Sequence, residues 1–226
     1  SGKVNAKDTF VGDVAQNKRL DVIFGLPASG KSTLANTISQ MYKSRFLDSD
    51  VAKELHKDYQ GGANSGPLHE ESRFITQQAQ EMMIANGDNV VLPIVGHSYK
   101  SAQRQLDAFK SAGYDIHMHR VELPWSVAVA RVMNRLAEDG RYLDIGYIMG
   151  TNDVKLSPAK IEDAFNRLYK EGYANGYAVW DNDVPRGEFA IPTEYSDGSE
   201  IAVRDFASKS GPVDSASITN GRGTDL

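Results

Sequence analysis

The sequence predicts an α/β fold in which a mainly parallel β-sheet lies between two layers of helices. Short apolar runs, typical of buried strands, alternate along the chain with segments whose apolar residues recur at helical spacing. Strands and helices that alternate in this way form parallel sheets with helices on both faces, and ligands bind at the carboxyl ends of the strands. The chain of 226 residues can bury a large core, and its lack of cysteine excludes disulfide frameworks, zinc–thiolate sites and thiol nucleophiles.

The expected elements have local signals where they begin or end. Leu20 to Phe24 is an apolar run that stops at Gly25, Ser157-Pro158 is a typical helix start, and glycine ends three of the expected helices. The expected strands cover residues 20–24, 45–47, 90–95, 116–123 and 178–180. The expected helices cover residues 31–41, 75–87, 102–113, 125–136 and 157–172.

The chain is expected to form one domain with an extension at each end. Residues 1–17 form an N-terminal extension and residues 18–207 the domain, in which 181–207 keeps only short strand-like pieces such as Phe189-Ala190-Ile191. Residues 208–226 lack aromatic side chains and are rich in small polar residues, so we expect a flexible tail. No run is apolar enough to span a membrane and no signal-peptide pattern is present, so we expect a cytoplasmic protein.

Residues 25–32 carry the phosphate-loop (P-loop) motif Gly-x-x-x-x-Gly-Lys-Ser. They are Gly25, Leu26, Pro27, Ala28, Ser29, Gly30, Lys31 and Ser32. The motif lies between an expected strand and an expected helix, the context that distinguishes a P-loop from an ordinary glycine-rich turn. Loop amides and the helix dipole favour phosphate, Lys31 supplies an ammonium for the phosphate oxygens, and Ser32 is expected to bind magnesium. The sequence thus predicts a P-loop NTPase fold that binds ATP and Mg²⁺, with Thr33 either at the site or packed in the first helical turn.

Two carboxylates after the second expected strand indicate the kind of P-loop protein. Strand 90–95 carries no acid where motor-type ATPases place their magnesium-binding aspartate, and no guanine-reading Asn-Lys-x-Asp motif follows a late strand. Asp48 and Asp50 instead end the second strand, where a carboxylate near the γ-phosphate can accept the proton of an attacking hydroxyl. This layout is typical of small-molecule kinases, with Asp48 near magnesium. The alternative for Asp50 is to cap the helix that follows it.

Three arginines can supply positive charge for the transferring phosphate. Arg131 and Arg135 are four residues apart on one expected helix, and Arg141 follows in a polar segment over 138–156 that we interpret as a small lid. We expect Arg131 near the ATP phosphates. A solvated surface arginine is the alternative at each of the three positions.

The order of these features resembles the zeta-toxin family of P-loop kinases, over roughly residues 18–180. The resemblance rests on the P-loop, on Asp48-Ser49-Asp50 followed by His56, on the segments 85–91 and 111–114, and on a strand that ends at Pro124. Toxin members of this family phosphorylate a sugar hydroxyl of UDP-N-acetylglucosamine.

The resemblance also implies roles for residues of the site. It makes Lys31 the phosphate lysine, Asp50 the general base for the acceptor hydroxyl, and Arg135 with Arg141 the clamp on the γ-phosphate. These four residues are the expected catalytic residues.

The residues expected to bind the acceptor depart from the family pattern. Where the toxins carry Gly-Thr after the third strand, this chain has Ile94-Val95-Gly96-His97, and Gln77 stands where they place a substrate-binding glutamate. Glu71 can supply a shifted carboxylate, or it is a first-turn acid favoured by the helix dipole. His97 and Tyr99 are expected to contact the acceptor, with a surface turn as the alternative for His97.

The sequence therefore predicts an ATP-dependent kinase that transfers the γ-phosphate to a hydroxyl of a nucleotide-containing small molecule. UDP-N-acetylglucosamine is the acceptor that the resemblance implies, and NAD or a polynucleotide 5′-hydroxyl are alternatives. A nucleotide-binding interaction module without turnover is an alternative of another class. The net charge of −5 offers no attraction to nucleic acid or to an anionic membrane, and the resemblance leaves an antitoxin-like protein partner open.

Overall fold

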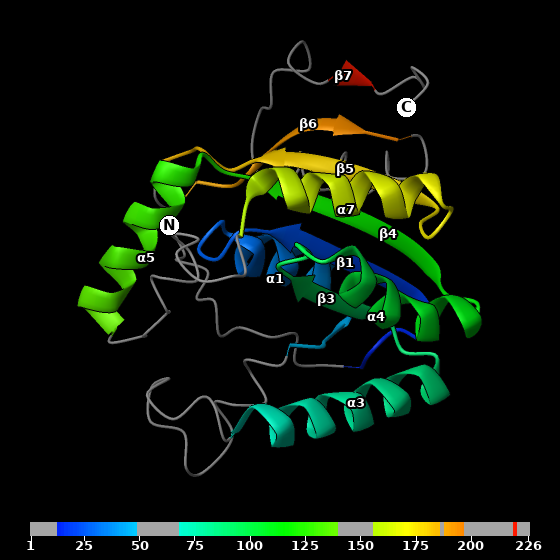
Figure 1. The fold of residues 1–226 in the computed structure, drawn as a ribbon. Helices are drawn as coiled ribbons and strands as arrows, with labels where there is room; N and C mark the ends of the chain where they lie inside the picture. Colours follow the sequence, from blue (N-terminus) through cyan, green and yellow to red (C-terminus); the bar gives the residue numbers. More distant parts are fainter. Residues whose placement is uncertain (1–12, 49–67, 140–155, 186–187, 197–218, 221–226) are drawn as a thin grey trace.

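The central sheet is the frame that positions the candidate site. This computed structural model describes residues 13–48, 68–139, 156–185, 188–196 and 219–220. Within these ranges, seven strands form one sheet in the order β2-β3-β1-β4-β5-β6-β7 (Figure 1). The strands are β1 (Arg19–Gly25), β2 (Arg45–Phe46), β3 (Val90–Ile94), β4 (Asp115–Glu122), β5 (Gly176–Asp181), β6 (Ile191–Tyr195) and β7 (Thr219–Asn220).

Five adjacent strands run parallel and bring their carboxyl ends to one edge of the sheet. β1 pairs in parallel with β3 and β4, β2 pairs with β3, and β4 pairs with β5. β6 runs antiparallel to β5, and β7 runs parallel to β6. The mainly parallel sheet predicted from the alternating pattern is confirmed. The segments that follow β1 to β5 therefore leave from one edge, where ligands bind in folds of this type.

Helices cover both faces of the sheet and give the fold three layers (Figure 1). α1 packs on one face, and α4 and α7 pack on the other. Ser98 and Ser157 cap α4 and α7 by accepting hydrogen bonds from the backbone amides of Ser101 and Lys160. No helix in the described ranges is long and apolar enough to cross a membrane. The helices are α1 (Lys31–Tyr42), α3 (Leu68–Asn86), α4 (Tyr99–Ser111), α5 (Trp125–Asp139) and α7 (Pro158–Lys170).

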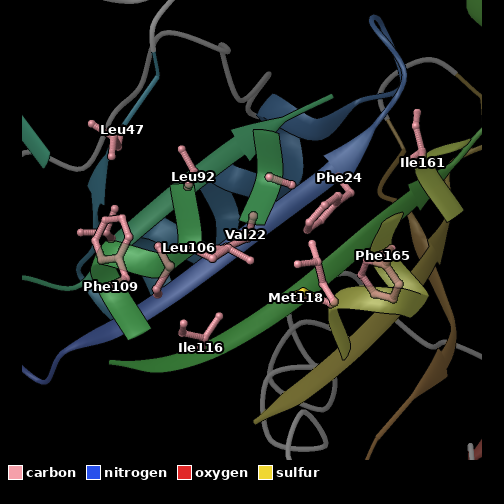
Figure 2. Close-up of a cluster of buried hydrophobic side chains, with 14 of the residues drawn as sticks. Val22, Phe24, Leu47, Leu92, Leu106, Phe109, Ile116, Met118, Ile161 and Phe165 are labelled. Carbon is pink, nitrogen blue, oxygen red and sulfur yellow. The ribbon is translucent and has the colours of Figure 1, made fainter. Parts of the chain in front are cut away.

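The larger of two apolar cores lies between the sheet and the α4–α7 layer. Alternate residues of β1, Leu20, Val22 and Phe24, face this core, whereas Ile23 faces α1. Figure 2 shows how Phe24 and its neighbours on the strands meet side chains from the helices, among them Phe165, whose ring lies edge-on to Phe24 with centroids 5.4 Å apart. Each fully buried side chain of this size stabilises the fold by about 2 kcal/mol. The central strand is thus held on both faces, and the loop after it starts from a fixed point.

Segments beyond the helical layers differ in detail from the expected pattern. The strand-like piece at Phe189-Ala190-Ile191 lies mostly before β6, which begins at its last residue. The segment 208–226, expected to be a flexible tail, contributes β7 beside β6, and its other residues lie outside the described ranges. An edge strand exposes unpaired backbone groups, which explains how β6 can hold a two-residue strand from a segment without aromatic side chains. In the expected N-terminal extension, the Ala15 amide donates to the Lys43 carbonyl.

Candidate nucleotide-binding site

The P-loop connects the end of β1 at Gly25 to the start of α1 at Lys31. Within it, Ala28 has a φ angle of 58° and Gly30 one of 91°, so both lie in the left-handed region. Left-handed residues within a turn point neighbouring backbone N–H groups into one concavity, and such concavities bind anions. A non-glycine residue in this region costs about 1 kcal/mol, and strain of this kind concentrates at functional sites. The loop therefore has a backbone suited to phosphate.

Close approach of neighbouring groups explains the two glycines of the loop. A Cβ atom at Gly25 would lie 2.7 Å from the Ser29 hydroxyl and 3.0 Å from the Val121 carbonyl oxygen. A Cβ atom at Gly30 would lie 2.1 Å from the Nδ2 atom of Asn182. Neither position has room for a side chain, so the loop is packed tightly against the rest of the domain.

The Lys31 ammonium is held at the P-loop itself. Its Nζ atom donates to the carbonyl oxygens of Gly25 (2.9 Å) and Leu26 (2.6 Å). Charge-assisted bonds to phosphate oxygens are stronger than bonds to neutral carbonyls, so a bound phosphate can recruit this ammonium. The Ser29 hydroxyl is buried and has no hydrogen-bond partner among the described residues. The loop thus keeps a cation and a buried hydroxyl for an anionic ligand.

Oxygen ligands of the type that Mg²⁺ prefers lie at the same edge of the sheet. Ser32 is half-buried in the first turn of α1, and Thr33 beside it is exposed. Asp48 follows β2 and is partly exposed. The residue before it, Leu47, continues the pairing of β2 with β3, because its amide donates to the Val91 carbonyl (2.9 Å). A hydroxyl and a carboxylate fit magnesium, which takes its other ligands from water and phosphate. Asp50, the expected general base, lies outside the described residues.

Of the three expected arginines, only Arg131 has a described side chain. Arg131, for which we expect a place near the ATP phosphates, donates from Nη2 to the backbone carbonyls of Asn182 (3.0 Å) and Val184 (3.2 Å). These two bonds join α5 to the segment after β5. Arg135 lies in α5, but its side chain is outside the description, as is the whole of Arg141.

His97, one of the expected acceptor contacts, follows β3 at the carboxyl edge of the sheet. It follows Gly96, whose φ angle of 72° and close packing on Phe24 allow no side chain, because a Cβ atom would lie 2.1 Å from the ring. Burial and the nearby charge of Lys160 lower the pKa of His97. Its imidazole is therefore neutral at pH 7, and it can donate one hydrogen bond and accept another.

The other expected acceptor contacts have different surroundings. Tyr99 donates to the Glu171 carboxylate, and the Arg167 guanidinium stacks on its ring at 3.8 Å, so its side chain belongs to the packing of α4 on α7. Gln77 is exposed on α3 and donates to Glu81 (3.1 Å). Glu71 also lies in α3, but its side chain is not described.

The sequence patterns gave no indication of Asn182, which contacts the P-loop from the segment after β5. Its Nδ2 atom donates to the Ser29 carbonyl oxygen at 2.6 Å, and both residues are buried. An isolated asparagine after a strand belongs to no sequence motif, so the sequence could not reveal this contact. The contact forms because β5 lies beside β4 in the folded sheet.

A network of buried charge lies further back along β1, on the face toward α1. The Asp21 carboxylate accepts from Nε and Nη2 of Arg19 (2.8 Å each) and from Nε2 of His119 (3.0 Å). Nδ1 of His119 in turn accepts from the Trp180 indole (3.3 Å). Burial lowers the pKa of His119 by more than the hydrogen bond and charge of Asp21 raise it, so the imidazole is neutral. For Asp21, burial raises the pKa, but the hydrogen bond from His119 and the charge and hydrogen bonds of Arg19 together lower it to about 2.

Comparison with protein families identifies the group to which this P-loop belongs. The profile of the Zeta toxin family matches residues 5–151. The chain belongs to the zeta toxin family. No match is found among curated proteins. The match covers the P-loop, Asp48 and Asp50, the residues expected to contact the acceptor, and all three arginines. Family membership together with the P-loop geometry supports a nucleotide-binding, kinase-like phosphotransferase that uses a divalent metal.

Several solved structures share the fold of this chain. A chain of the PezAT chromosomal toxin–antitoxin system of Streptococcus pneumoniae matches with a TM-score of 0.57 and 11% identity, over 76% of this chain and 70% of that one. A chain of the AvrRxo1-ORF1:-ORF2 complex with ATP matches with a TM-score of 0.60 and 15% identity, over 86% of this chain and 63% of that one. A chain of the Pnkp1/Rnl/Hen1 RNA repair complex matches with a TM-score of 0.51 and 18% identity, over 69% of this chain and 47% of that one.

The last two matches therefore span less than two thirds of the other chain. At these identities the likeness shows a shared fold.

Proposed function

We propose that the protein is an ATP-dependent kinase that phosphorylates a hydroxyl of a nucleotide-containing small molecule. The observation that carries this proposal is the P-loop, with left-handed backbone at Ala28 and Gly30 and with Lys31 held at its mouth. Phosphoryl transfer depends mainly on positioning and on neutralising charge, and the loop offers amides, a helix dipole and an ammonium for that purpose.

In the proposed reaction, Asp50 accepts the proton of the acceptor hydroxyl while the hydroxyl oxygen attacks the γ-phosphorus and ADP leaves. Lys31 neutralises charge on the β- and γ-phosphates, and Arg135 with Arg141 holds the transferring group. Ser32 and Asp48 would hold magnesium, which supplies further neutralisation of the phosphate charge when bound.

UDP-N-acetylglucosamine is the first acceptor to test, because it is the acceptor that the family resemblance implies. His97 follows β3 at the carboxyl edge, and its neutral imidazole suits a sugar hydroxyl. Gln77 replaces a glutamate of the family pattern, so acceptors that differ in the sugar or ribose belong in the same experiment. An antitoxin-like protein partner is part of the proposal, supported by membership of a toxin family.

Mass spectrometry of a panel of acceptors tests the proposal. UDP-sugars, NAD, nucleosides and a short oligonucleotide are each incubated with the protein, ATP and Mg²⁺. Lys31→Ala is expected to abolish transfer, whereas Lys110→Ala is a matched control, because Lys110 donates to the Gly172 carbonyl (2.9 Å) at the far end of α4. One added phosphate on one acceptor, absent only with Lys31→Ala, is the expected result. Binding of ATP without modification of any acceptor would favour a nucleotide-binding module instead.

A further inference from the structure

The segment after β5 buttresses the P-loop through one side chain. Asn182 donates from Nδ2 to the Ser29 carbonyl oxygen at 2.6 Å. The asparagine is 8% exposed and Ser29 is fully buried, so water does not compete freely for this bond. The contact also fills the space beside Gly30, where a Cβ atom would lie 2.1 Å from the same nitrogen. The bond is therefore short, buried and sterically defined.

Asn182 is itself fixed on both sides of its backbone. Its amide donates to the Glu122 carbonyl at the end of β4 (3.0 Å). Its carbonyl accepts from Nη2 of Arg131 (3.0 Å), and the same nitrogen donates to the Val184 carbonyl (3.2 Å). A continuous set of hydrogen bonds thus runs from α5 through the segment after β5 to the P-loop.

The bond from Asn182 to the Ser29 carbonyl also sets the direction of the Gly30 N–H. In a planar trans peptide, the C=O of one residue and the N–H of the next point in opposite directions. The bond that holds the Ser29 carbonyl toward Asn182 therefore turns the Gly30 N–H away from Asn182. Gly30 is the N-cap of α1, so this N–H is among the amides at the helix N-terminus that a phosphate would use.

We propose that Asn182 is a positioning residue, which fixes the direction of the Gly30 amide before a polyphosphate binds, and that Arg131 acts through Asn182. This inference rests on the proposed nucleotide site. It adds to that site two residues outside the P-loop motif, Asn182 and Arg131, that hold the loop in place. Arg131 is thereby a brace for the P-loop rather than a direct contact of the nucleotide. A preoriented donor does not have to be ordered during binding, so its loss weakens affinity for the phosphate chain.

Binding of inorganic tripolyphosphate with Mg²⁺, and of Mg-ATP, tests the role of Asn182 by isothermal titration calorimetry. Asn182→Ala is expected to weaken both ligands by about tenfold, the effect of one buried hydrogen bond. Asn175→Ala is the matched control, because the Asn175 side chain accepts from the Ile116 amide (3.1 Å) at the opposite edge of the sheet. The control is expected to bind both ligands like wild type, even if it loses similar stability.

A double-mutant cycle distinguishes the two roles of Arg131. If Arg131 acts through Asn182, Arg131→Met weakens tripolyphosphate binding, Arg131→Lys restores part of it, and the double variant with Asn182→Ala is no weaker than the single Asn182→Ala variant. Additive losses would show instead that Arg131 acts independently of Asn182, which would overturn its role as a brace.

Equal affinities of wild type and Asn182→Ala would overturn the positioning role while leaving the nucleotide site in place. Failure of wild type to bind either ligand would overturn the nucleotide site itself, and the positioning role with it.

Discussion

Replacement of Asp21 by asparagine is expected to destabilise the fold by about 3–5 kcal/mol at pH 7, as removal of one partner from a buried charge network does. The carboxylate is fully buried and accepts three hydrogen bonds, two from Arg19 and one from His119. These partners lower its pKa from 3.8 to about 2. At 1.36 kcal/mol per pH unit, that difference corresponds to about 2.4 kcal/mol in favour of the ionised carboxylate.

The asparagine side chain adds a second cost. Its amide group must face an Arg19 N–H in either orientation, because Arg19 donates to both oxygens of the Asp21 carboxylate. A buried donor left without an acceptor costs about 1–3 kcal/mol. The two contributions together give the expected range.

Urea denaturation followed by tryptophan fluorescence measures this loss. Asp115→Asn is the matched control, because the Asp115 carboxylate is 53% exposed and accepts a single bond from His117 (3.0 Å). Its loss is expected to stay below about 1 kcal/mol, as for other exposed pairs. If Asp21→Asn were no less stable than Asp115→Asn, the network around Asp21 would not stabilise the fold as argued.

Further predictions concern the acceptor side, the loops and the buried histidine. Asp50→Asn should bind ATP in a calorimeter like wild type yet transfer no phosphate by mass spectrometry, and an active variant would remove Asp50 as the base. Gly96→Ala should lower the free energy of unfolding in urea by at least about 2 kcal/mol, because φ is 72° and Phe24 leaves no room; full stability would contradict that packing. Tyr99→Phe should leave the acceptor KM unchanged, whereas a large rise would make Tyr99 an acceptor contact. Because burial lowers the pKa of His119 in the folded state, the unfolded chain binds a proton first as pH falls below about 6.5, and the stability that the neutral imidazole contributes is lost. The difference in free energy of unfolding between wild type and His119→Gln should therefore be smaller at pH 5 than at pH 7.5. A constant difference would contradict burial of a neutral imidazole.

Strands β1 to β5, the helices and the P-loop could be predicted because each has a local signal. The run from Leu20 to Gly25 and the motif that ends at Ser32 place strand, loop and helix without any knowledge of their neighbours. The alternation of strands and helices also predicted a mainly parallel sheet, but it did not predict the order of the strands within it.

Contacts between distant parts of the chain could not be predicted in the same way. The bond from Asn182 to Ser29 joins residues 153 positions apart, and the bond from His119 to Asp21 joins residues 98 apart. Tyr99 is adjacent in sequence to the expected acceptor site, but its side chain contacts Arg167 and Glu171 at the end of α7. Asp50 and Arg141 remain predictions, because both lie outside the described residues.

Transfer of a labelled γ-phosphate tests the central claim most directly. Wild type and Lys31→Ala are each incubated with Mg²⁺, ATP labelled in the γ-phosphate and an unfractionated extract of small molecules. We expect the label to move, with wild type alone, to a small molecule that carries a nucleotide. Label that stays in ATP, or that appears only as inorganic phosphate, would contradict the assignment of this P-loop to a kinase.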